Sequence, residues 1–167
     1  MAYRYWSMMT DKKFALIYLG LHYHKNVQIE RWMNIILAII STGSLGALLF
    51  FDQHQYILTI ILALAQIATA ARPYLPYQYR MQELEKGLFV LNDLYNDIEE
   101  KWLSIASGTL QDEEINNLYY ELVRKWDELD SKILKKDSLP RRKKFIKQAN
   151  DEKEMYFTVM FGGDTNE

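Results

Sequence analysis

Cysteine is absent from the sequence, and this absence excludes several classes of function at once. A disulfide scaffold, a thiolate metal site and a cysteine nucleophile all require this residue. The balance of charge is also small, because 20 Lys and Arg stand against 22 Asp and Glu, for a net charge of -2. Such a balance gives no overall reason to expect nucleic-acid binding, although local clusters remain informative.

Charged residues are almost missing from the middle of the chain, where Asp52 is the only one between Trp32 and Ala71. The run 32–51 has twenty uncharged residues, enough at about 1.5 Å per residue to cross a hydrocarbon core of roughly 30 Å. The run 56–71 has sixteen, so a buried soluble helix is the alternative interpretation. The link between them is short enough to make the helices antiparallel neighbours, and an isolated apolar hairpin lacks a soluble cover. We therefore predict two transmembrane helices.

The cations indicate the orientation of this hairpin, because cytosolic flanks are rich in Lys and Arg. They precede the first run at Arg4, Lys12, Lys13, Lys25 and Arg31 and follow the second at Arg72, Arg80 and Lys86. We expect both termini in the cytosol. About thirty mixed residues come before the first run, unlike the short basic start of a signal peptide, so we expect this span to be retained.

Small and polar residues recur in both predicted spans. Ala38, Thr42 and Gly46 repeat every four residues, which allows close helix packing. Two polar pairs are seven residues apart and share a helix face, Asn34 with Ser41 and Thr59 with Gln66. These four residues are the candidate lining of a water-filled path, and hydrogen bonding between helices is the alternative. An amide near mid-membrane is costly in lipid, which favours oligomers.

A helix is predicted over 10–30, with Thr10 as its cap. Its apolar side chains are expected at Phe14, Ile17, Tyr18 and Leu21. This amphipathic helix either lies on the membrane surface or packs on later helices. The histidines are interpreted as surface residues, because their spacing does not suit a metal site: His22, His24 and His54.

Two prolines, Pro73 and Pro76, end the second span, and a long helix with three-four apolar spacing follows over 81–105. Its seam comprises Met81, Leu84, Leu88, Leu91, Tyr95, Ile98, Trp102 and Ile105. This pattern predicts a coiled coil or bundle and also suggests a contact between copies. Gly108 ends the helix.

The segment 109–161 is expected to hold the remaining cytosolic helices. The first begins near Asp112 and pairs antiparallel with the seam helix, and a weaker one starts at Pro140. Residues 162–167 form a tail.

The segment from Lys135 to Lys147 is strongly basic, whereas the helix before it is acidic. Its seven cations are Lys135, Lys136, Arg141, Arg142, Lys143, Lys144 and Lys147. One interpretation is a solvated stretch that pairs with the acidic helix or touches anionic lipid. The other is an anion sensor for a nucleotide or short oligonucleotide, with Phe145 available for stacking.

The order of these parts over roughly residues 1 to 105 resembles the SLATT family of bacterial two-span proteins. The resemblance rests on the amphipathic first helix, the two spans with their four-residue polar link, the small and polar residues from Ser41 to Gly46, and the heptad helix. It implies a pore-forming effector of bacterial antiviral defence in the inner membrane, encoded beside a nucleotidyltransferase or another sensor, that damages the cell's own membrane.

The predicted fold is therefore an all-α membrane protein with an amphipathic N-terminal helix, a transmembrane hairpin and a cytosolic helical bundle or coiled coil. The predicted function is a homo-oligomeric channel gated by the cytosolic helices. A membrane-anchored scaffold for a cytosolic partner is the main alternative, and a holin-like lysis protein is a third. We expect neither an enzyme nor a cofactor, because the sequence has no Gly-rich phosphate loop and no HExxH motif.

Overall fold

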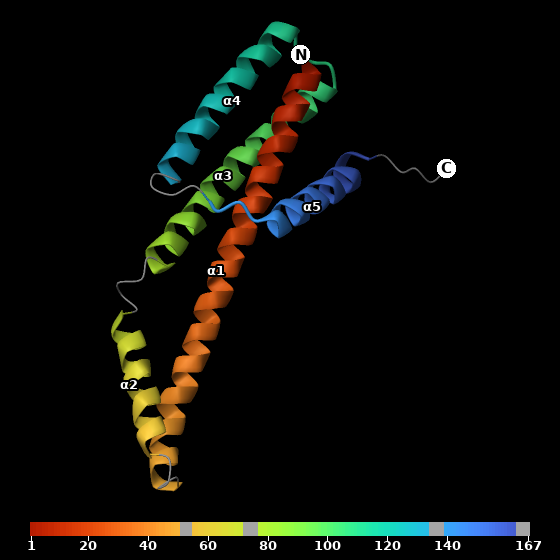
Figure 1. Cartoon of the computed structure of the whole chain (residues 1–167). Helices are drawn as coiled ribbons and strands as arrows, with labels where there is room; N and C mark the ends of the chain where they lie inside the picture. The colour runs from red at the N-terminus through yellow and green to blue at the C-terminus, as the bar shows by residue number, and fades with distance from the viewer. Residues whose placement is uncertain (51–54, 72–76, 134–138, 163–167) are drawn as a thin grey trace. The chain divides into compact units, whose positions relative to one another are not determined.

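The computed structural model describes residues 1–50, 55–71, 77–133 and 139–162, with side chains at 41–50, 55, 57–58, 71 and 77–80 left out. These residues form five helices and no strand, which confirms the all-α prediction. The helices are α1 (Ala2–Phe50), α2 (Gln55–Ala71), α3 (Tyr77–Ala106), α4 (Asp112–Ile133) and α5 (Lys143–Phe161) (Figure 1).

The chain divides into two compact units. The bundle unit comprises Met1–Tyr23 and Glu83–Glu167, and the hairpin unit comprises His24–Gln82. Helix α1 contributes its first part to the bundle unit and its remainder to the hairpin unit.

Helix α1 joins into one helix the two segments, 10–30 and 32–51, that were predicted from the sequence as separate helices. It begins at Ala2, eight residues before the predicted cap. Thr10 lies inside the helix, and its hydroxyl donates a hydrogen bond to the Ser7 carbonyl at 2.8 Å. A hydroxyl satisfied by the preceding turn is compatible with a helix interior. Since the segment contains no proline, nothing in it forces the helix to end.

The first part of α1 packs in the core of the bundle unit, which decides between the two placements that the sequence left open. The face that it buries differs from the predicted one. Its buried side chains are Tyr5, Met8, Met9, Leu16, Leu19 and His22, whereas Phe14, Ile17, Tyr18 and Leu21 are only half-buried. The prediction that His22 is a surface residue is therefore wrong, because its side chain is 5% exposed.

The seam of α3 is buried inside one chain. Leu84, Leu91, Tyr95, Ile98 and Ile105 belong to the core, together with residues of α1 and α4. The Tyr5 hydroxyl donates to the Ile98 carbonyl at 2.9 Å, which ties α1 to α3. The seam spacing is confirmed as a packing pattern, but these side chains are already covered and are not available as a contact between copies.

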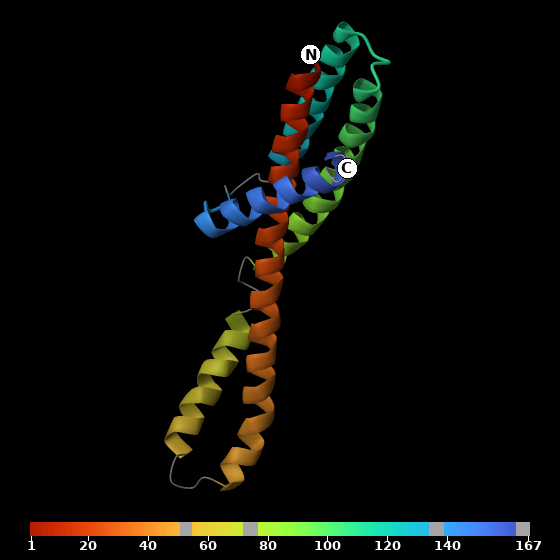
Figure 2. The same cartoon turned by 90° about the vertical axis from the view of Figure 1, so that its right-hand side faces the viewer.

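Helix α4 returns alongside α3 after a short turn, as predicted (Figure 2). Gly108 has a φ of 71°, a conformation that glycine adopts without the steric cost of a Cβ, and its N–H donates to the Ile105 carbonyl at 3.0 Å. The new helix starts with Asp112, Glu113 and Glu114, whose charges suit the positive end of the helix dipole. The Glu114 carboxylate also accepts a hydrogen bond from the Gln111 N–H at 2.8 Å.

Helix α5 crosses the first part of α1 and is attached mainly by aromatic side chains (Figure 2). Trp6 packs edge-on against Phe157 and Phe161, with ring centroids 5.1 Å and 5.4 Å away. Ala149 is the buried residue that this helix contributes. Most of the buried side chains of the bundle unit thus belong to α1, α3 and α4.

A lysine lies among tyrosine rings where α1, α3 and α5 meet. The Lys13 ammonium lies 3.4 Å from the Tyr156 ring centroid and 4.5 Å from that of Tyr95. The Tyr156 hydroxyl donates to the Glu99 carboxylate at 2.6 Å. Burial lowers the pKa of Lys13, and burial, with smaller contributions from nearby acidic groups, raises the pKa of Tyr5, Tyr95 and Tyr156.

These shifts predict that the bundle unit loses stability above about pH 10, the pKa of tyrosine in an unfolded chain. Because the three folded tyrosines hold their protons to higher pH, their contribution is complete below that pH and is lost above it. Lys13 acts in the opposite direction, since its folded pKa is lowered, but it is one group against three. Circular dichroism and tyrosinate absorbance measured together should show loss of helix as these tyrosines ionise. Their ionisation with the helices intact would contradict the prediction.

Candidate functional site

The hairpin unit exposes large apolar side chains along both of its helices. In both figures α2 runs beside the second part of α1. No Lys, Arg, Asp or Glu occurs at 32–50 or 55–71. Exposed apolar residues here are Trp32, Ile35, Ile36, Ile39, Tyr56, Ile60, Ile61, Leu64 and Ile67. Apolar patches of this kind mark surfaces that contact a protein or a membrane.

Among the residues that the structure describes, no helix contains an apolar stretch of the length and hydropathy needed to cross a membrane. The two predicted spans therefore stay a prediction.

The predicted pore-lining residues are only partly described. Asn34, Thr59 and Gln66 have exposed side chains, and the side chain of Ser41 lies outside the described residues. Ala38, predicted to pack between helices, is exposed. The side-chain surroundings of its predicted companions, Thr42 and Gly46, are not described.

A groove runs between the two helices of the hairpin unit. We call it the hairpin groove, and its lining is Leu37 and Ile40 from α1 and Leu62, Ala65, Gln66, Thr69 and Ala70 from α2. The Thr69 hydroxyl donates to the Ala65 carbonyl at 2.8 Å, so this polar group is satisfied within its own helix. Gln66 is the one residue of the predicted pore lining that the structure places in this groove.

The basic segment is described from Leu139 onward, so Lys135 and Lys136 lie outside the described residues. The five remaining cations are exposed and make no ion pair with described residues: Arg141, Arg142, Lys143, Lys144 and Lys147. The Tyr18 hydroxyl fixes the backbone here, because it donates to the Pro140 carbonyl at 2.9 Å and accepts from the Arg142 N–H at 3.2 Å.

Phe145 is not available for stacking a base, contrary to the prediction. Its half-buried ring packs edge-on against His22, with ring centroids 4.9 Å apart. The Arg142 guanidinium lies 5.7 Å from the centroid of the same ring. The side chain therefore anchors α5 to α1, and the charges alone remain for an anion.

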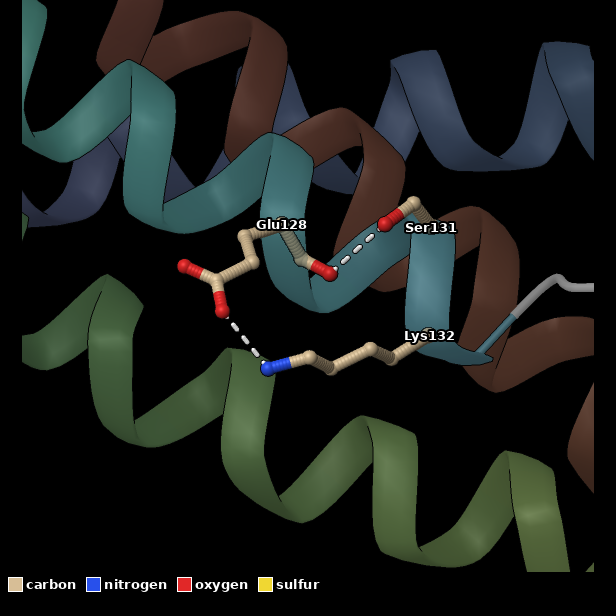
Figure 3. A network of polar contacts seen from close by, with 3 residues as sticks. All are labelled: Glu128, Ser131 and Lys132. Carbon is tan, nitrogen blue, oxygen red and sulfur yellow. Dashed lines mark hydrogen bonds and ion pairs between the residues drawn. The ribbon is translucent and has the colours of Figure 1, made fainter.

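The acidic helix α4 pairs with lysines of α1 and of its own sequence. Glu128 accepts a 2.6 Å bond from Lys132, while its main-chain carbonyl accepts one from Ser131 at 2.8 Å (Figure 3). The Lys132 ammonium lowers the pKa of the Glu128 carboxyl. Lys125 pairs with Glu121 at 2.8 Å and Lys12 with Asp127 at 3.6 Å. Within the described part of the chain, pairing between the basic segment and the acidic helix is not seen.

No group of three or more His, Asp or Glu side chains in the described residues is arranged to hold a metal ion. Comparisons with protein-family models, curated proteins and solved structures give no match for this chain.

Proposed function

We propose that this chain is a membrane protein whose hairpin unit inserts into a bilayer and whose copies assemble into an ion-conducting pore, with the bundle unit in the cytosol. One observation carries the proposal: the hairpin unit exposes Ile and Leu side chains along two helical stretches, 32–50 and 55–71, that bear no charge. Burial of apolar surface is worth about 25 cal/mol per Å², so this hairpin is unfavourable in water and favourable in lipid.

The uncharged stretches of the two helices come close in length to the thickness of a hydrocarbon core. The uncharged part of α1 extends from Trp32 to Phe50 and is about 28 Å long, and α2, with 17 residues, is about 25 Å long. A hydrocarbon core is roughly 30 Å thick, and a bilayer thins locally around a shorter helix at modest cost. Cations flank both helices on the side of the chain termini, which supports cytosolic termini.

Polar side chains on the hairpin support a pore rather than a plain anchor. Asn34, Thr59 and Gln66 are exposed on helices that are otherwise apolar. An amide in lipid is costly, and one hairpin has too little surface to enclose the amides of Asn34 and Gln66. Copies of the hairpin around a water-filled path would place these amides in water. The resemblance to SLATT proteins adds a biological setting, which is damage to the bacterial inner membrane during antiviral defence.

The basic segment is the proposed binding site for a ligand that controls this pore. Five exposed cations within seven residues, which make no ion pair with described residues, attract phosphate groups, and the backbone beneath them is fixed by Tyr18. A nucleotide or an oligonucleotide supplied by a partner sensor, such as a nucleotidyltransferase, fits this chemistry.

Reconstitution in liposomes of bacterial lipids tests the function. We expect the wild-type protein to resist extraction by carbonate and to release entrapped ions. We expect Gln66→Leu to lower ion release per inserted protein several-fold, because it removes a polar group from the path. Ile61→Leu, a change at another exposed position of the same helix, is the matched control and should leave the release unchanged.

Two results would count against this function. Insertion of the wild-type protein without any ion release would favour the membrane-anchored scaffold. Recovery of the protein in the carbonate extract would contradict membrane insertion itself.

A further inference from the structure

We infer that the hairpin groove of one copy receives a ridge of α2 from a second copy, so that the hairpins join head to tail into a closed ring. The ridge comprises Ile60, Leu64 and Ile67. The inference rests on the proposed function and names the contact by which the copies of the pore assemble.

The ridge is a continuous row of large side chains that the described residues of its own chain leave exposed. The three residues are spaced by four and three positions, so they share one face of α2. Their side chains are 60%, 60% and 64% exposed. Rows with this spacing are the ridges that pack into grooves of neighbouring helices.

The hairpin groove lies on the opposite face of the same helix. With about 3.6 residues per turn, Ala65 and Thr69 are turned roughly half a revolution away from the ridge. These two residues are small, so another helix can approach closely. The groove has a volume of about 460 Å³. Since a cavity of roughly 150 Å³ holds a benzene-sized group, there is room for about three branched aliphatic side chains.

A ridge and a groove on opposite faces make a heterologous contact, in which each copy uses two different surfaces. Such contacts close into rings when each copy is related to the next by the same rotation about a single shared axis. Membrane insertion provides that axis, because every copy crosses the bilayer in the same sense. Gln66 and Ala70 form one edge of the hairpin groove, with Thr59 on the same side of α2, and Ile61 and Ala68 lie on the other flank. In the ring this polar edge of the contact borders the water-filled axis, and the apolar flank faces lipid.

The absence of cysteine makes the contact testable by disulfide formation. We expect the double variant Leu64→Cys with Thr69→Cys, oxidised in liposomes, to give a ladder of covalent oligomers that ends at the ring size. Each single variant has one thiol per chain and should stop at dimers. A control pair, Leu64→Cys with Ile36→Cys, places the second thiol on an exposed side chain that does not line the hairpin groove, and should give no ladder.

The outcomes separate this contact from the proposed function. Two results would overturn the contact and leave the pore intact, provided that the inserted protein releases ions. One is that Leu64→Cys with Thr69→Cys forms no ladder, and the other is that the control pair forms an equal ladder. A ladder without ion release would support the contact and count against the pore. If the protein stays out of the membrane, a ladder in solution still supports the head-to-tail contact and its absence overturns it.

Discussion

Replacing Ile98 with alanine is expected to lower the free energy of unfolding of the bundle unit by about 3 kcal/mol, within the range for buried isoleucines truncated to alanine. The Ile98 side chain is fully buried, at 0% exposure, in the core that α3 shares with α1 and α4. The substitution leaves a cavity among side chains from three helices. The loss can be measured by urea unfolding of the full chain in detergent, followed by tryptophan fluorescence, because Trp6, Trp102 and Trp126 report on this unit.

Leu103→Ala is the matched control for this prediction. It lies on the same helix but is 61% exposed, so its loss should stay within about 0.5 kcal/mol. Neither variant should change the size of the assembled particle, because the seam is buried within a single chain. Equal losses at the two positions, or smaller particles for Ile98→Ala alone with its fold intact, would mean that the seam faces another copy.

The helices of the bundle unit can be predicted from the sequence more completely than the contacts that each helix makes with the others. The seam of α3 is unambiguous, since Leu84, Leu91 and Ile98 recur every seven residues and all are buried. The start of α4 at Asp112 follows from the Gly108 turn and the acidic first turn. Both signals are local, so they can be read without knowledge of the rest of the fold.

The register of α1 was missed because this helix carries two apolar rows. Phe14 and Tyr18 form one row, and Met9 and Leu16 belong to the other. Periodicity predicts a helix for both rows, but only packing against α3 and α4 decides which row is buried. The contact of Phe145 with His22 is equally non-local, because its partners are more than 120 residues apart.

In the hairpin unit the sequence indicates which residues are polar but not which face of α2 packs on α1. The uncharged runs and the pair of Thr59 and Gln66 are evident from spacing alone. The ridge of Ile60, Leu64 and Ile67 has the same three-four spacing as a core-facing stripe, so the sequence gives no reason to leave it uncovered. Only the packing of α2 against α1 determines that these side chains stay exposed.

Gly87→Ala is expected to lower the free energy of unfolding of the bundle unit by about 1 to 3 kcal/mol, the usual cost of overpacking. In a helix interior this change is normally favourable by roughly 0.5 to 1 kcal/mol, because alanine loses less backbone entropy on folding. At Gly87 the added Cβ would lie 2.6 Å from the Cγ2 atom of Ile133, closer than carbon atoms approach. The clash is with the side chain of α4 that closes the core at this end, so α3 and α4 must move apart or Ile133 must leave its rotamer.

Gly20→Ala, in the same unit, is expected to change the free energy of unfolding in the opposite direction. A Cβ at Gly20 meets nothing within 4 Å, so this change should raise the free energy of unfolding by roughly 0.5 to 1 kcal/mol. Adding Ile133→Ala to Gly87→Ala removes the atoms that clash, and the double variant should be more stable than the sum of the two single losses. Urea unfolding of the four variants measures this coupling. A stabilising Gly87→Ala, or strict additivity with Ile133→Ala, would show that α3 and α4 do not approach closely at this glycine.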